Sequence, residues 1–246
     1  MTGMLIQLVL AVVPAVLAIT LHEAAHGYAA LLLGDDTARR AGRLSLNPIR
    51  HVDRVGTIIV PGLLMLGQLL TIHRVAFMFG WAKPVPVDPR RFPNPRRGMA
   101  LVAVAGPLMN FVLAWIGALL MPAANAPDGD SLGALDAALA THPFVGMFLF
   151  YFILTNLVLG LFNLLPIPPL DGGRIAVGVL PLPLAIRWAQ LERAGLVIVL
   201  LVVFILPHLI DFDPVGAALG TILPWAFRTV FWLAGHDVSD VGGGLL

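Results

Sequence analysis

Hydrophobic residues along this chain are concentrated in long runs that short polar segments separate. An apolar run of about 20 residues can cross the hydrocarbon core of a bilayer as an α-helix. Runs of this length, or somewhat shorter, occupy residues 4–33, 99–121, 144–165, 196–210 and 215–233. The pattern predicts an all-α membrane protein, a polytopic helical bundle with about five or six transmembrane helices. No repeat or linker divides the chain, so we expect a single integral-membrane domain over residues 1–246.

The segment of residues 57–73 is apolar but short, and Pro61-Gly62 is expected to break it. The flanking polar segments 34–56 and 74–97 are both rich in arginine, whereas residues 122–142 contain no Lys or Arg. Basic loops favour the cytoplasmic side, so both flanking segments should be cytoplasmic, with residues 122–142 and the N-terminus external. We therefore predict a re-entrant segment around residues 57–87 beside a water-filled site. A full membrane span is the alternative.

The composition agrees with a membrane protein and excludes several kinds of functional site. Hydrophobic residues make up 59% of the chain, charged residues 12%, and the mean hydropathy is +0.91. A net charge of +1 leaves no basic face, so we predict no nucleic-acid partner. The absence of cysteine excludes disulfides, thiol catalysis and Cys-ligated metals. Residues 1–7 lack Lys and Arg and the first apolar run is long, which favours an uncleaved helix over a signal peptide.

The first apolar run contains the sequence HEAAH at residues 22–26. On an α-helix His22 and His26 lie one turn apart on the same face, so both imidazoles can reach one metal ion. Glu23 lies beside them, where it can take a proton from a water molecule at the metal. Ionisable residues in an apolar helix are costly and usually mark a functional site. The alternative is that these side chains face a polar groove and only hydrogen-bond to one another.

A hydrolytic zinc site usually has three protein ligands and one open position. The third ligand must be a histidine or a carboxylate, because the chain has no cysteine. Asp171 is the candidate, since it is the one aspartate between residues 142 and 210 and follows an apolar run. The prolines of PIPP at 166–169 end that helix, and Gly172-Gly173 allows the backbone to approach closely. The alternative is that Asp171 only caps a short helix that begins near Gly172.

Three stretches together resemble the site-2 protease family of intramembrane zinc metalloproteases, peptidase family M50. They are HEAAH, GPLMN at residues 106–110, and N-x-x-P-x-P-P-L-D-G from Asn163 to Gly172. The resemblance covers roughly residues 10–175 and is that of a compact core member, without the PDZ or CBS domain of larger members. It implies a helical membrane core in which the HExxH helix and the LDG segment meet at zinc.

The resemblance also implies the roles of individual residues. His22, His26 and Asp171 would be the ligands of one Zn²⁺ per chain, and Glu23 the general base. Asn163 would help to hold the substrate or the developing oxyanion. In the GPLMN stretch, Gly106 would permit close helix packing and Asn110 would hydrogen-bond across helices.

The function expected from these features is hydrolysis of peptide bonds within or near transmembrane segments of membrane-protein substrates. His22 lies about twelve residues, or about 18 Å, before the helix end near Gly34. The active site should therefore lie within the bilayer, nearer the cytoplasmic side of the cell (inner) membrane. The expected partners are transmembrane protein substrates and membrane lipid, and no oligomeric state is predicted. The alternatives are a metal-ion transporter and a catalytically silent membrane scaffold, and the ligand set also suits Fe(II) or Co(II).

Overall fold

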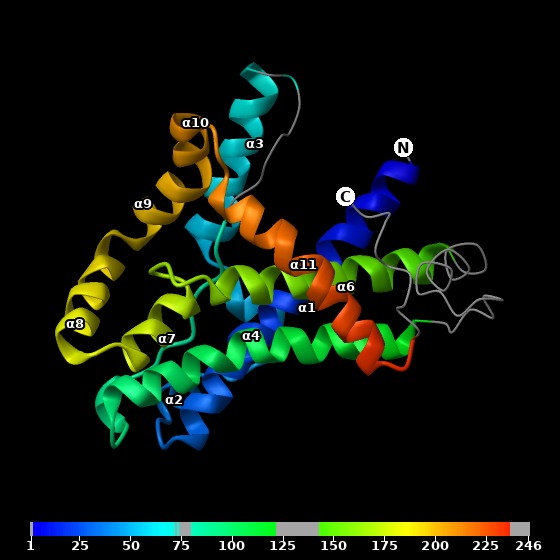
Figure 1. The fold of residues 1–246 in the computed structure, drawn as a ribbon. Helices are drawn as coiled ribbons and strands as arrows, with labels where there is room; N and C mark the ends of the chain where they lie inside the picture. Colours follow the sequence, from blue (N-terminus) through cyan, green and yellow to red (C-terminus); the bar gives the residue numbers. More distant parts are fainter. Residues whose placement is uncertain (1, 72, 74–79, 122–142, 237–246) are drawn as a thin grey trace.

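Every regular element in the described part of the chain is a helix, which confirms the predicted all-α class (Figure 1). The computed structural model describes residues 2–71, 73, 80–121 and 143–236. The α-helices are α1 (Thr2–Leu32), α2 (Thr37–Arg40), α3 (Val60–Thr71), α4 (Pro95–Leu120), α6 (Pro143–Leu164), α7 (Asp171–Val179), α8 (Leu182–Gln190), α9 (Gly195–Leu200), α10 (Leu206–Ile210) and α11 (Pro214–Leu233). Short 3₁₀ and π segments are η1 (Pro48–His51), η2 (Arg54–Ile59), η3 (Pro89–Arg91), η4 (Leu191–Ala194) and η5 (Leu201–Ile205).

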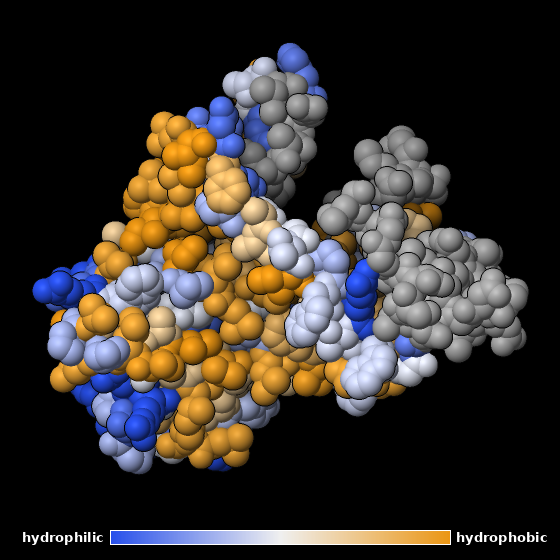
Figure 2. Space-filling view, viewed as in Figure 1, coloured by the Kyte–Doolittle hydropathy of each residue, from blue (hydrophilic) through white to orange (hydrophobic). Residues whose placement is uncertain are grey.

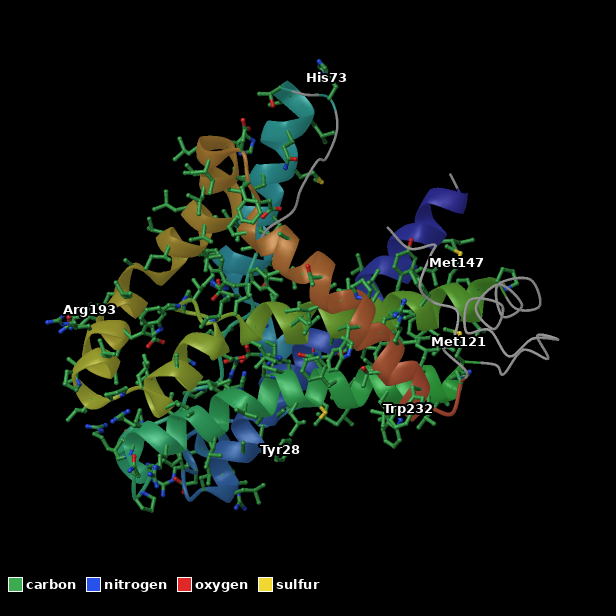
Figure 3. All side chains as sticks on the ribbon, in the orientation of Figure 1. Tyr28, His73, Met121, Met147, Arg193 and Trp232 are labelled. Atoms are coloured by element: carbon green, nitrogen blue, oxygen red, sulfur yellow. The ribbon has the colours of Figure 1, made fainter. Side chains whose placement is uncertain are left out.

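The centre of the bundle is formed by α1, α4 and α6, each of which packs against the other two. Helix α4 begins where the Asn94 side chain accepts a hydrogen bond from the Arg97 N–H at 3.1 Å, with Pro95 at the first helical position. Met121 follows α4 and Met147 lies early in α6, and both lie at the same end of the bundle, so the two helices run antiparallel (Figure 3). Their apolar contact continues into α11, whose Phe231 belongs to the same buried cluster as Ile153.

Four helical stretches of the described residues are long and apolar enough to cross a membrane: Val12–Leu32, Arg54–Thr71, Pro95–Leu120 and Pro143–Leu164. The surface agrees, because apolar side chains cover α9 and the middle of α4 (Figure 2). The chain is a membrane protein. The last two predicted spans are also helical, as residues 195–210 and α11, but neither belongs to these four.

Residues 54–71 form one continuous helix, so the predicted break at Pro61-Gly62 is wrong. The π-helical turns of η2 directly precede Pro61 and bond each N–H to the carbonyl five residues back. Pro61 has no N–H to donate to the Gly56 carbonyl, five residues back, but this carbonyl accepts from Trp81 instead and the helix continues past Pro61. The Trp81 N–H donates to the Gly56 carbonyl at 3.1 Å, so the chain returns to the end of the helix where it started, as expected of a re-entrant segment. Residues 72, 74–79 and 122–142, including the predicted external loop, lie outside the described residues.

Residues 80–88 form no helix or strand, but the alternate N–H groups of Trp81, Lys83 and Val85 all donate to the rest of the protein, which is the pattern of an extended segment. The Lys83 N–H donates to the His51 carbonyl at 2.8 Å, and the Asp88 N–H donates to Asp35 Oδ2 at 2.7 Å. Burial by itself raises the pKa of Asp35, but hydrogen bonds from Thr37 and Asp88 and the charge of Arg91 outweigh it, and the pKa lies below its usual value. Asp35, with no exposed surface, is thus an ionised anchor for this segment.

Asp35→Asn is expected to destabilise the protein by on the order of 1–3 kcal/mol at pH 7. One carboxylate oxygen of Asp35 accepts from Thr37 and the other from Asp88, whereas asparagine has only one side-chain oxygen. The folded-state pKa is lowered, so the stabilisation is complete above the unfolded pKa of about 3.9 and is lost as the pH falls below it. Thermal unfolding in detergent at pH 7 and at about pH 2 measures the destabilisation by Asp35→Asn, which should be smaller at the lower pH. Asp36→Asn, at the partly exposed neighbour, is the control, and equal melting of the wild type and Asp35→Asn at pH 7 contradicts the anchor.

Candidate metal centre

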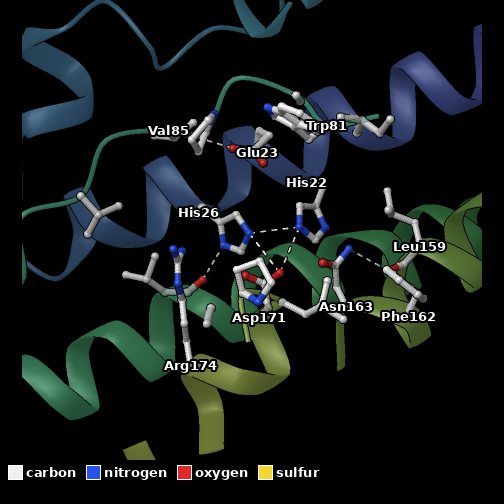
Figure 4. Close-up of a pocket in the computed structure, with 18 of the residues that line it drawn as sticks. His22, Glu23, His26, Trp81, Val85, Leu159, Phe162, Asn163, Asp171 and Arg174 are labelled. Atoms are coloured by element: carbon white, nitrogen blue, oxygen red, sulfur yellow. Dashed lines mark hydrogen bonds and ion pairs between the residues drawn. The ribbon is translucent and has the colours of Figure 1, made fainter. Parts of the chain in front are cut away.

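The three predicted metal ligands meet in the interior of the bundle (Figure 4). His22 and His26 come from the middle of α1, and Asp171 is the first residue of α7. The two Nε2 atoms are 3.0 Å apart, and Asp171 Oδ2 lies 3.1 Å from His22 Nε2 and 3.3 Å from His26 Nε2. All three residues are buried, with exposed fractions of 5%, 9% and 5%. A tetrahedral zinc ion with ligands at about 2.0–2.2 Å places its ligand atoms about 3.3–3.6 Å apart, which is close to this triangle.

The proline-rich turn before α7 directs Asp171 towards α1. Helix α6 ends at Leu164, and a Cβ atom at Gly172 would lie 2.2 Å from the Leu165 carbonyl oxygen, so only glycine permits this close passage of backbone. The N-cap of α7 is Leu170, and the Asp171 side chain contacts the two histidines. The alternative in which Asp171 only caps this helix is therefore wrong.

The far sides of both imidazole rings are hydrogen-bonded. His26 Nδ1 donates to the Val102 carbonyl of α4 at 2.7 Å, and His22 Nδ1 lies 2.6 Å from Asn110 Oδ1 of the same helix. A carbonyl oxygen can only accept, so each ring carries a hydrogen on Nδ1, and in its neutral form directs the lone pair of Nε2 inwards.

A carboxylate oxygen completes the group: Asp171 Oδ2 is buried, and among the described residues its neighbours within ion-pair distance are the two Nε2 atoms. Three electron-pair donors thus meet at one point, which is an arrangement that a cation stabilises.

A cavity of about 580 Å³ opens beside the three ligands. Glu23 lines it, half-buried, and its Oε2 accepts a hydrogen bond from the Val85 N–H at 3.0 Å, so the extended segment holds the carboxylate in place. Asn163, near the end of α6, lines the same cavity and donates one N–H to the Leu159 carbonyl at 3.0 Å (Figure 4). The structure therefore brings all five predicted site residues to one cavity.

Some residues of the centre were not singled out from the sequence. Asn156 of α6 is fully buried and its Oδ1 accepts from Asn110 Nδ2 at 2.8 Å. A polar amide inside an apolar run is itself a signal for a functional residue, and it could have identified Asn156. Val85 and the Val102 carbonyl act through their backbone, for which the sequence contains no signal.

Comparison with known proteins identifies the family. The family model described as peptidase family M50 matches residues 129–206, which include Asn163 and Asp171. Over 196 residues the chain is 42% identical to "Putative zinc metalloprotease YwhC" of Bacillus subtilis (strain 168), covering 80% of each chain. This chain belongs to peptidase family M50. The resemblance to the site-2 protease family is thereby confirmed.

A second relative of this M50 chain is "Putative zinc metalloprotease Rip2" of Mycobacterium tuberculosis (strain ATCC 25618 / H37Rv). The two are 31% identical over 223 residues, which is 90% of this chain and 70% of the relative. No solved structure matches significantly. Family membership supports a metalloprotease, and the buried His22, His26 and Asp171 are a group able to hold its metal.

Proposed function

We propose that this M50 metalloprotease is an intramembrane zinc protease that cleaves peptide bonds within or near transmembrane segments of membrane proteins. The observation that carries the proposal is the buried triangle of His22, His26 and Asp171 with Glu23 at the same cavity. One Zn²⁺ per chain would be held by His22 Nε2, His26 Nε2 and an Asp171 carboxylate oxygen. When bound there, zinc supplies a Lewis acid that polarises the peptide carbonyl and makes water more acidic.

The protein's own residues would move the protons. Glu23, oriented by the Val85 N–H, takes a proton from the attacking water and passes it to the leaving amine. Asn163 has a second amide N–H beyond the one bonded to Leu159, and this donor stabilises the negative charge that develops on the substrate carbonyl oxygen.

The substrate would be bound as an extended chain, because a helical backbone hides its carbonyl groups from attack. The N–H groups of Trp81, Lys83 and Val85 are all used within the protein. In an extended segment alternate residues face opposite edges, so the other edge belongs to Ala82, Pro84 and Pro86. Prolines have no N–H, and this edge would bind substrate mainly by accepting hydrogen bonds at its carbonyls.

The position in the membrane follows from the charges. Hydrophilic side chains gather around α2 and the beginning of α4, at the end of α1 that follows the HEAAH motif (Figure 2). Basic residues favour the cytoplasmic side. We infer a cytoplasmic location for this end, an external N-terminus, and an active site nearer the cytoplasmic side of the cell membrane.

Asp171→Ala is expected to remove zinc from the purified protein, because two imidazoles alone leave the ion without its anionic ligand. Elemental analysis should give about one zinc per wild-type chain and close to none for the variant, with cleavage of a transmembrane substrate lost in parallel. Asp36→Ala removes a carboxylate from surface ion pairs with Arg40 and Arg91 and should keep its zinc. Equal zinc in the wild type and Asp171→Ala excludes Asp171 from the ligands.

A further inference from the structure

A chain of hydrogen bonds between buried amides connects the metal centre to helix α6. His22 Nδ1 lies 2.6 Å from Asn110 Oδ1, and Asn110 Nδ2 donates to Asn156 Oδ1 at 2.8 Å. Asn156 Nδ2 in turn donates to the carbonyl of Phe152, one turn earlier in α6, at 2.8 Å. Both asparagines are fully buried, so water does not substitute for any of these partners.

The Phe152 carbonyl sets the direction of this series of hydrogen bonds. An asparagine amide can turn over and exchange its oxygen and nitrogen, but a backbone carbonyl can only accept. The Phe152 carbonyl therefore requires Nδ2 of Asn156 and turns Oδ1 towards α4. That oxygen requires Nδ2 of Asn110, and the Ala18 carbonyl, 3.4 Å from Asn110 Nδ2, favours the same orientation. Asn110 is left with its oxygen facing His22.

The orientation of Asn110 determines where His22 carries its hydrogen. An oxygen at 2.6 Å requires an N–H at Nδ1 and leaves the Nε2 lone pair directed at His26 and Asp171. If Asn110 turned over, its NH₂ group would donate to Nδ1 and the ring hydrogen would move to Nε2. A protonated Nε2 has no lone pair for a metal ion.

We propose that Asn156 is a positioning residue for the metal centre, which selects the metal-binding tautomer of His22 by fixing the amide of Asn110. The inference rests on the proposed zinc site. It is specific to one ligand, because His26 Nδ1 donates directly to the Val102 carbonyl, which cannot be exchanged. Asn156 also lies two helical turns before Asn163 on the same face of α6, so one helix both orients a metal ligand and presents a group to the substrate.

Two substitutions of Asn156 with the same number of side-chain heavy atoms separate this role from packing. Asn156→Leu removes both hydrogen bonds, so only the longer contact with the Ala18 carbonyl at 3.4 Å still orients the amide of Asn110. Asn156→Asp, in the neutral form that burial favours, can donate its O–H to the Phe152 carbonyl and accept from Asn110 Nδ2. We expect Asn156→Leu to bind zinc about 10- to 100-fold more weakly and Asn156→Asp to bind within about threefold of the wild type.

A double-mutant cycle with Asn110→Asp isolates the tautomer effect. The carboxyl group of Asn110→Asp faces the N–H of His22, which stabilises its ionised form, so it accepts from His22 Nδ1 in either orientation and leaves no amide for Asn156 to fix. Asn156→Leu should therefore have no further effect on zinc affinity in the Asn110→Asp background. A general loss of packing would instead weaken zinc binding in both backgrounds.

The measurement is the zinc dissociation constant of the purified full-length chain in detergent, by competition with a chromogenic chelator. Thermal unfolding of the metal-free proteins shows that the variants are folded. If Asn156→Leu does not fold, Asn156→Ser replaces it, because its hydroxyl is too short to reach Asn110.

The outcomes separate this inference from the proposed function. Weaker binding for Asn156→Leu alone, with no effect in the Asn110→Asp background, supports it. If the wild type binds zinc and folded Asn156→Leu binds it equally well, or Asn156→Asp is as weak as Asn156→Leu, the positioning role is overturned and the zinc site stands. If the wild type itself binds no zinc, the metal site and the positioning role are overturned together.

Discussion

Glu23→Gln is expected to retain zinc while cleavage of a transmembrane substrate falls by about 10²- to 10⁴-fold, the range over which general acid–base catalysis contributes. Glutamine has nearly the same shape, and its carbonyl oxygen can still accept the hydrogen bond from the Val85 N–H. The substitution removes only the ability to take a proton from water. The metal ligands, the extended segment and the cavity should keep their arrangement.

The experiment compares zinc content and single-turnover cleavage for the wild type, Glu23→Gln and Glu192→Gln. Glu192 is the other glutamate of the chain and pairs with Arg174 at 2.6 Å, so its substitution tests the same chemical change away from the ligands. Glu192→Gln should keep most of its activity. Undiminished cleavage by Glu23→Gln excludes Glu23 as the base. A wild type that binds zinc but cleaves no substrate favours the alternatives, a metal-ion transporter or a silent scaffold.

Gly106→Ala is expected to weaken zinc binding by about 100-fold or more and to abolish cleavage with it, a loss at or beyond the upper range for residues that only support metal ligands. A Cβ atom at position 106 would lie 2.5 Å from Cε1 and Nε2 of His26 and 2.6 Å from Cε1 of His22. These distances are far below van der Waals contact, so either both rings turn away from Asp171 or α4 moves off α1. Either change separates the ligand atoms.

Gly220→Ala in α11 is the matched control, because no atom of the described residues outside its own stretch of helix lies within 4 Å of the added methyl group. Alanine in a helix interior is favoured over glycine by about 0.5–1 kcal/mol, so this variant should melt at the same or a higher temperature and keep its zinc. Chelator competition and thermal unfolding are measured on both variants. Wild-type zinc affinity in Gly106→Ala contradicts the close packing of α4 against the two histidines.

Local features of the sequence were enough to predict much of this protein. The apolar runs predicted its long helices, because a segment in a bilayer must satisfy its backbone hydrogen bonds within itself. The spacing of His22 and His26 placed both rings on one face, since helical geometry relates residues four apart regardless of their surroundings. The same local reasoning was wrong at Pro61, where the preceding π-helical turns accommodate the missing N–H.

Only the tertiary structure decided which distant groups meet at the centre. From the sequence, Asp171 suited a helix cap as well as a metal ligand. The packing of α7 against α4 places the Asp171 carboxylate beside the histidines of α1, and this distinguishes the two roles. The Val85 N–H on Glu23, the amides on His22 and the space at Gly106 likewise depend on contacts between separate segments. Periodicity describes one helix at a time, whereas the chemistry of this centre arises from distances between helices.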